Sequence, residues 1–150
     1  MCHRLFSTFK APVDGFVYYK PIVQVDGTVL YEKYKWTLLV VVTQDGASLI
    51  LSIVFALVED KTMEAWSFFV QNLKRHVAKQ QGICLTSDMH ISIISAYKKH
   101  DSRWTPDNSV HVNCIRHIVQ NFMRHFNRLG LRKNVISMGK FHNQRIIIFY

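Results

Sequence analysis

Two aspartates, Asp26 and Asp88, each follow a short apolar run of strand-forming residues. Asp26 ends the run at residues 22–25, and Asp88 comes directly after the run at residues 83–87. If the two strands are neighbours in one sheet, both carboxylates converge at the same edge. Carboxylates that lie close together repel each other unless a cation separates them, and such hard oxygen ligands select Mg²⁺ or Mn²⁺. A pair of these ions about 4 Å apart supports phosphodiester cleavage or strand transfer.

The same two aspartates also have a purely structural interpretation, which spacing alone favours. Asp26 and Gly27 together form a common turn dipeptide. Asp88 stands before a helical pattern and has the residue type of an N-cap. Both interpretations remain open at this level.

A second group of possible metal ligands is formed by His111, Cys114 and His117. A cysteine and a histidine three positions apart at a helix start can share a zinc ion. A closed zinc site needs four ligands, and only His90 and His125 are available to complete it. The sequence therefore favours helix-start hydrogen bonding, or a role in orienting DNA near the carboxylates, over bound zinc.

The chain is strongly basic, with a formal net charge of +9 and a pI near 9.7. All ten acidic residues lie between Asp14 and Asp107, so residues 108–150 carry no negative side chain. This basic segment contains Arg116, Arg124, Arg128, Arg132, Lys133, Lys140 and Arg145. It is either a solvated basic face or a surface that contacts the phosphates of a nucleic acid.

Several other classes of protein are disfavoured. The three cysteines show no regular spacing, which is typical of reduced thiols in an intracellular protein. The apolar stretch at residues 37–58 is interrupted at residues 44–46, so two strands explain it better than a membrane helix. Neither a phosphate-binding glycine loop nor a dinucleotide fingerprint is present, and Ser87 has no nucleophile-elbow motif around it.

Periodicity predicts three strands, followed by alternating helices and strands. The strands are expected at residues 22–25, 37–43, 48–58, 83–86 and 109–113, and the helices at 62–81, 91–99 and 115–128. Asp45-Gly46 predicts a tight hairpin turn with positive φ at both central residues. The continuous apolar character of the run at residues 48–58 indicates burial on both faces. Asp60 or Thr62 is expected to cap the first helix.

This order predicts an α/β fold, in which a mixed five-stranded sheet combines an antiparallel meander with parallel strands and has helices on both faces. It is the succession of the RNase H-like fold, although an α+β sandwich gives a similar pattern. We expect a single domain over residues 1–150. Within it lie a lead-in at 1–20, a partial core at 21–128 and a poorly ordered basic tail at 129–150.

A series of motifs in a fixed order resembles the catalytic domain of plant Mutator-like element (MULE) transposases. The motifs are KPIVQVDGT at 20–28, TQDG at 43–46, FALVE at 55–59, EAW at 64–66, GICL at 82–85, SD at 87–88, HVNCIRHI at 111–118 and NF at 121–122. The likeness covers most of residues 5–139. It implies an RNase H-like fold in a nuclear enzyme that uses Mg²⁺ or Mn²⁺. Such enzymes cut DNA at terminal inverted repeats and join the 3′ ends to a target.

The resemblance also assigns roles to individual residues. Asp26 and Asp88 look like the first two metal-binding acids of a DDE triad, and Cys114 and His117 look like the family's Cys-x-x-His motif. DNA is the implied partner, and the candidate DNA-binding residues are Arg116, Arg124, Arg128, Arg132 and Lys133. A membrane partner is not implied.

The chain departs from the family pattern at several positions. Met89 replaces a basic residue, and Glu32 and Trp36 stand where glycine is usual. The third acid is expected well beyond His117, yet no Asp or Glu follows Asp107. We therefore expect a truncated or degenerate transposase core that is inactive alone. The alternative is a domesticated, non-catalytic DNA-associated transcription regulator; an RNA-binding module is disfavoured because no aromatic-basic stacking motif is present.

Overall fold

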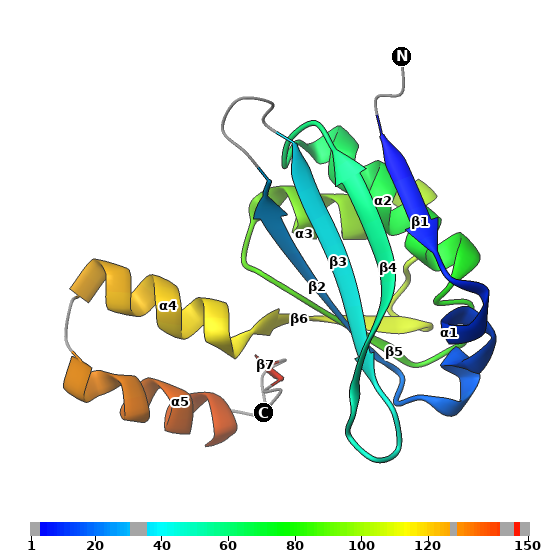
Figure 1. Ribbon diagram of the computed structural model, residues 1–150. Coiled ribbons are helices and arrows are strands. Elements are labelled where there is room, and N and C mark those ends of the chain that lie inside the picture. Colours follow the sequence, from blue (N-terminus) through cyan, green and yellow to red (C-terminus); the bar gives the residue numbers. More distant parts are fainter. Residues whose placement is uncertain (1–3, 31–35, 127–128, 142–145, 148–150) are drawn as a thin grey trace.

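The computed structural model describes residues 4–30, 36–126, 129–141 and 146–147. These residues form one mixed sheet with the strand order β1-β4-β3-β2-β5-β6-β7 (Figure 1). The strands are β1 (Leu5–Thr8), β2 (Ile22–Val29), β3 (Thr37–Gln44), β4 (Ile50–Val58), β5 (Ile83–Ser87), β6 (Ser109–Cys114) and β7 (Ile146–Ile147). Strands β1 to β4 are antiparallel, whereas β2, β5, β6 and β7 run parallel. The mixed α/β architecture is therefore as predicted, but the described sheet has seven strands instead of five.

Five α-helices and three short 3₁₀ turns connect the described strands. The helices are α1 (Lys10–Gly15), α2 (Met63–His76), α3 (Ile91–Lys98), α4 (Ile115–Phe126) and α5 (Arg132–Phe141), and the 3₁₀ turns are η1 (Phe16–Tyr18), η2 (His100–Ser102) and η3 (Leu129–Leu131). Helix α5 lies within the segment at 129–150 that was expected as a basic tail. None of the described helices combines the length and the apolar character that a membrane crossing requires.

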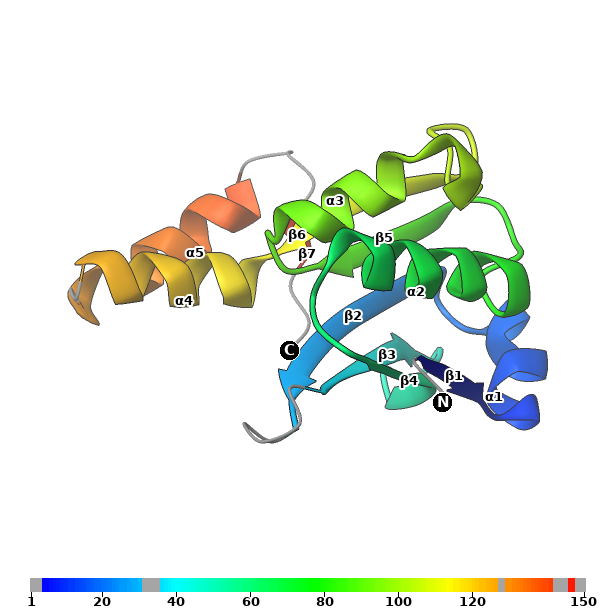
Figure 2. The ribbon, with the colours of Figure 1, turned by 90° about the horizontal axis from the view of Figure 1, so that it is seen from above.

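Helices α2 and α3 pack together on one face of the sheet (Figure 2). The expectation of helices on both faces is wrong, because α4 and α5 extend away past β6 instead of covering the second face (Figure 1). The reason is local: β6 ends at Cys114 and α4 begins at Ile115, so no loop is available to turn the helix back over the sheet.

The core lies between the sheet and α2. Trp66, Phe69 and Leu73 recur at helical spacing and are buried, as their periodicity predicts. Thr62 is the N-cap, and its side chain accepts a hydrogen bond from the backbone N–H of Ala65 at 3.2 Å. From Val54 to Val58, strand β4 alternates between buried and half-buried residues, so the expected burial of this run on both faces is wrong. The alternation arises because only one face is covered by helices.

Two details of the antiparallel half differ from the sequence-based expectation. Strand β1 pairs with β4 in a segment that was expected to be a lead-in, and Arg4 beside it donates hydrogen bonds to Glu59. The β3–β4 hairpin forms, but its turn is longer than predicted. The side chain of Asp45 accepts a hydrogen bond from Leu49 N at 2.9 Å, and Ser48, not Gly46, has the positive φ of 66°.

Candidate active site

Asp26 lies inside strand β2, opposite Val40 of β3, because the strand continues to Val29. The turn interpretation of Asp26 and Gly27 is therefore wrong. Gly27 leaves room for two neighbouring side chains, because an added Cβ would lie 2.8 Å from Cδ2 of Leu39 and 3.3 Å from Cε of Lys61, and both side chains would have to shift. Lys61 crosses the strand here, and its Nζ donates a hydrogen bond to the carbonyl oxygen of Gly27 at 3.1 Å.

Asp88 comes directly after β5, the parallel neighbour of β2. The register pairs Gln24 with Thr86, so two further residues along each chain bring Asp26 level with Asp88. The carboxylate of Asp88 accepts a hydrogen bond from the backbone N–H of His90 at 3.2 Å. The N-cap of α3 is His90, whose Nδ1 accepts from Ser92 N, so the interpretation of Asp88 as the cap is wrong.

The two carboxylates line one cavity of about 510 Å³. Its other walls come from Lys61 before α2 and from the first three turns of α4. The lining side chains are Asp26, Gly27, Lys61, Asp88, Met89, His90, His117, Gln120, Asn121 and Arg124. The cavity thus combines two acidic groups with cationic and amide groups, which is a suitable environment for a metal ion or a phosphodiester.

The Cys-x-x-His motif lies beside the carboxylates, at the junction of β6 and α4. Nε2 of His117 is 3.6 Å from Oδ1 of Asp26. The hydrogen bond with Cys114 raises the pKa of His117; burial opposes this, and the negative charges of Cys114, Asp26 and Asp88 add to it. His117 therefore favours its cationic form and offsets part of the repulsion between the two acids.

The thiol of Cys114 is buried, and its environment is polar. Burial raises the pKa of this thiol, but hydrogen bonds from the side chain of His117 and from the backbone of His117 and Arg116 outweigh it, so that the pKa is lowered. On the other side, Nε2 of Gln24 lies 4.0 Å from the sulfur atom. The motif therefore joins β6 to β2 next to Asp26, a link that its sequence spacing does not reveal.

The segment of the chain that carries this site matches a known domain family. The MULE transposase domain family matches residues 22–121, which is two thirds of the chain. The chain belongs to this family. The matched segment begins with β2 and ends within α4, so it contains both carboxylates and the Cys-x-x-His motif. No curated protein matches the chain.

In this MULE domain, the third member of the histidine-cysteine group is separated from the other two. His111 lies on β6 three residues before Cys114, so strand alternation directs its ring to the opposite face. There it lies 2.8 Å from Oγ of Ser87 and stacks on Tyr97 of α3. Among the described residues, no three His, Cys, Asp or Glu side chains are grouped closely enough to hold a metal ion.

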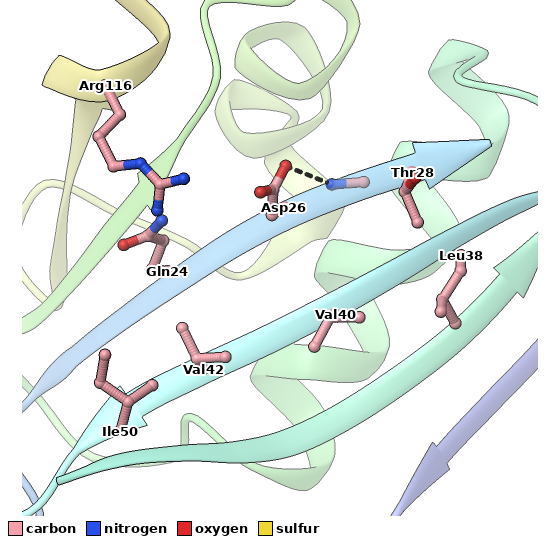
Figure 3. Close-up of a pocket in the computed structure, with 9 residues that line it drawn as sticks. Gln24, Asp26, Thr28, Leu38, Val40, Val42, Ile50 and Arg116 are labelled. Carbon is pink, nitrogen blue, oxygen red and sulfur yellow. Dashed lines mark hydrogen bonds between the residues drawn. The ribbon is translucent and has the colours of Figure 1, made fainter. Parts of the chain in front are cut away.

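The predicted DNA-binding residues of the MULE domain occupy different surfaces. Arg116 lines an open groove of about 370 Å³ on the uncovered face of the sheet, together with Gln24, Asp26 and apolar side chains of β3 (Figure 3). Arg124 lines the carboxylate cavity. Arg132 and Lys133 are exposed at the start of α5, and Arg128 lies outside the described residues. A transposase domain interacts with DNA in general, so DNA is the general partner of the chain.

Two residues of the site were missed from the sequence. Lys61 had no signal except its place between Asp60 and the cap residue Thr62. Gln24 is 6% exposed within the otherwise apolar run at residues 22–25, and a buried amide is a recognisable sign of a local polar partner. Both residues contact the site through side-chain hydrogen bonds to residues that only the folded sheet brings near, Gly27 for Lys61 and Cys114 for Gln24.

Proposed function

We propose that this domain performs, in its parent transposase, metal-dependent DNA cleavage and strand transfer at terminal inverted repeats in the nucleus. The observation that carries the proposal is the placement of Asp26 and Asp88 in one cavity, with Asp26 inside β2 and Asp88 directly after its parallel neighbour β5. The strand order β4-β3-β2-β5-β6 supports an RNase H-like fold, because that fold places its first and fourth strands side by side. Here β2 and β5 correspond to those two strands.

The two carboxylates suit Mg²⁺ or Mn²⁺. In each of them Oδ1 accepts a backbone hydrogen bond, from Gly27 in one case and from His90 in the other. These bonds orient the groups, and the remaining oxygen of each is available within the described structure. Mg²⁺ is commonly held by one or two carboxylates together with substrate phosphates and water, so the donor set fits. When bound, the ion would activate the attacking oxygen and stabilise the leaving one.

The surrounding side chains would bind and orient the DNA. Arg124 lines the cavity as a donor for a phosphate oxygen, and Lys61 adds a second positive charge at the edge of β2. Nε2 of His117 lies 3.6 Å from Oδ1 of Asp26, and the raised pKa of this histidine favours its cationic form beside the two acids. The ring of donors around two acids is therefore arranged for a polyanion that approaches along the open side.

We further propose that these 150 residues bind DNA without cutting it. No Asp or Glu follows Asp107, so the chain offers only two acids where the family's two-metal chemistry uses three. A displacement of about 1 Å at a reacting centre already costs about 100-fold in rate. The same observation favours the second candidate, a non-catalytic DNA-associated regulator that keeps the transposase fold.

The test measures Mn²⁺ binding and nicking of a terminal-repeat duplex by the same protein. We expect Mn²⁺ to bind, Asp26→Asn and Asp88→Asn to abolish that binding, and no duplex to be nicked. Asp107→Asn is the matched control, because Asp107 is exposed in the loop before β6. Nicking that is lost in Asp26→Asn would show that two acids suffice, whereas Mn²⁺ binding that is unaffected by both variants would contradict the metal site.

A further inference from the structure

Ser87, the last residue of β5, links the neighbouring strand to the main chain of Asp88. Its side chain is fully buried. Its hydroxyl donates a hydrogen bond to the carbonyl oxygen of Asp88 at 2.9 Å and lies 2.8 Å from Nε2 of His111. A hydroxyl group has a single hydrogen, so Nε2 of His111 must be the donor in the second bond. The result is a directed chain of two hydrogen bonds from His111 through Ser87 to Asp88.

The histidine at the start of this chain is held from two sides. The parallel register of β5 and β6 places His111 opposite Leu85, two residues before Ser87. Its ring stacks on Tyr97 of α3 with ring centroids 5.2 Å apart, and Tyr97 also packs against Trp104 at 5.7 Å. His111 is therefore anchored by a strand and a helix, and its Nε2–H is aimed at the end of β5.

Asp88 needs such support more than Asp26 does. Asp26 lies inside β2, where pairing with Val40 of β3 holds its backbone in the sheet. Asp88 lies past the end of β5, where the strand passes into the segment before α3. The carbonyl of Asp88 is held by Ser87, so this bond sets the direction in which the following backbone and the carboxylate leave the sheet.

We infer that His111 is a positioning residue that acts through Ser87 to aim the carboxylate of Asp88 at Asp26. The inference rests on the proposed function, because this aim matters for an ion held between the two acids. Partners of this outer kind typically contribute 10- to 100-fold to metal affinity. Here they act through the main chain, so we expect an effect near the lower end of that range, about 10-fold.

The experiment measures Mn²⁺ affinity by electron paramagnetic resonance in variants of the full chain. His111→Phe keeps a ring against Tyr97 but removes the donor, and Ser87→Ala removes the bridge. We expect each to weaken Mn²⁺ binding about 10-fold, and the double variant to be no worse than either single one. His111→Gln, which retains an N–H donor, should recover part of the affinity.

Ser109→Ala is the matched control. Ser109 lies on the same strand, and its hydroxyl also bridges two groups, Tyr97 Oη at 2.9 Å and the carbonyl oxygen of Thr105 at 3.0 Å, but it is outside the hydrogen-bond chain from His111 through Ser87 to Asp88. We expect its Mn²⁺ affinity to stay within about twofold of the wild type, below the range for an outer-shell partner of a ligand. An equal loss in Ser109→Ala, or additive losses in the double variant, would overturn the inference.

A second readout separates this inference from the proposed function. If the wild type binds Mn²⁺ no better than Asp26→Asn does, the metal proposal has failed. The backbone amide resonances of Asp88 and Met89 then decide on the positioning role. Larger shifts of these resonances in Ser87→Ala and His111→Phe than in Ser109→Ala support it, and equal or smaller shifts overturn it.

Discussion

The two faces of the sheet differ in what covers them and in what they carry. Along β2, Val23 and Val25 point to the face under α2 and α3 and are at most 1% exposed. Their neighbours Gln24, Asp26 and Thr28 point to the other face and line the open groove (Figure 3). One strand thus contributes to the core with every second residue and to the site with the residues between them.

This division indicates that folding and function depend on separate sets of side chains. The covered face holds a continuous apolar core, whose burial provides most of the folding free energy. The open face carries Asp26, Arg116 and a row of half-buried apolar residues of β3. Substitutions on the covered face should therefore unfold the domain, whereas substitutions on the open face should change binding.

The largest contrast is expected between two adjacent leucines of β3. Leu39 is 1% exposed and faces the core, whereas Leu38 is half-buried and lines the open groove. Leu39→Ala should lower the free energy of unfolding by about 2–5 kcal/mol. Leu38→Ala should lower it by about 1 kcal/mol or less, because the side chain of Leu38 buries less apolar surface than that of Leu39. Urea titration measures both, and equal losses would show that the open face is covered in solution.

A smaller contrast is expected between two glycines. A methyl group at Gly27 would meet Leu39 and Lys61, whereas at Gly46 it would meet nothing within 4 Å. Gly27→Ala should cost about 1–3 kcal/mol of stability through overpacking. Gly46→Ala should be neutral or stabilise the fold by about 0.4–1 kcal/mol, since its φ is not positive. Thermal unfolding distinguishes them, and a neutral Gly27→Ala would mean that Leu39 and Lys61 move aside without cost.

Much of the fold could be predicted because local patterns and burial agree. The helical spacing of Trp66 and Phe69 predicted α2, and a cap at Thr62 was one of two expected choices. Strand β1 was missed because four residues carry little periodicity, and its pairing depends on β4 and on Arg4 meeting Glu59 more than fifty residues away. Contacts over such separations leave no signature in a short window.

The candidate site was predictable only in part, for a related reason. Parallel pairing of the strands that carry Asp26 and Asp88 was enough to bring both into one cavity. The sequence grouped His111 with Cys114 and His117, but β6 continues to Cys114 and so turns His111 to the other face. Which face a residue occupies depends on the register of its strand, and a shift by one residue moves its side chain to the other face.

The pH dependence of stability tests the link between the two acids and the Cys-x-x-His motif. The folded pKa of His117 is raised, so its contribution is fully present below the unfolded pKa of about 6.5 and is lost as the pH rises through the folded value. The wild type should therefore exceed His117→Gln most at low pH, with a shrinking difference on alkalinisation. Cys114→Ser should lower the pKa of His117 more than Asp26→Asn does, because the bond to Cys114 is the larger cause.

Nuclear magnetic resonance titration of His117 in Cys114→Ser and Asp26→Asn measures directly which substitution lowers its pKa more. A larger effect of Asp26→Asn than of Cys114→Ser would place the imidazole closer to the acids than to the thiol. A difference between wild type and His117→Gln that grows with pH would contradict the sign of the expected shift.

The smallest effect on stability is expected for substitution of Arg116. For this residue, the two faces of the sheet are compared by their contribution to DNA binding. Arg116 is exposed beside the open groove, and Arg75 is exposed on α2, on the helix-covered side. Both alanine variants should stay within about 0.5 kcal/mol of the wild-type stability. If DNA approaches the open face, only Arg116→Ala should weaken binding, and it should reduce the slope of log affinity against log salt by about 1. An equal loss of DNA affinity in Arg75→Ala would mean that the helix-covered face also contacts the phosphates. DNA binding would then not be confined to the open face.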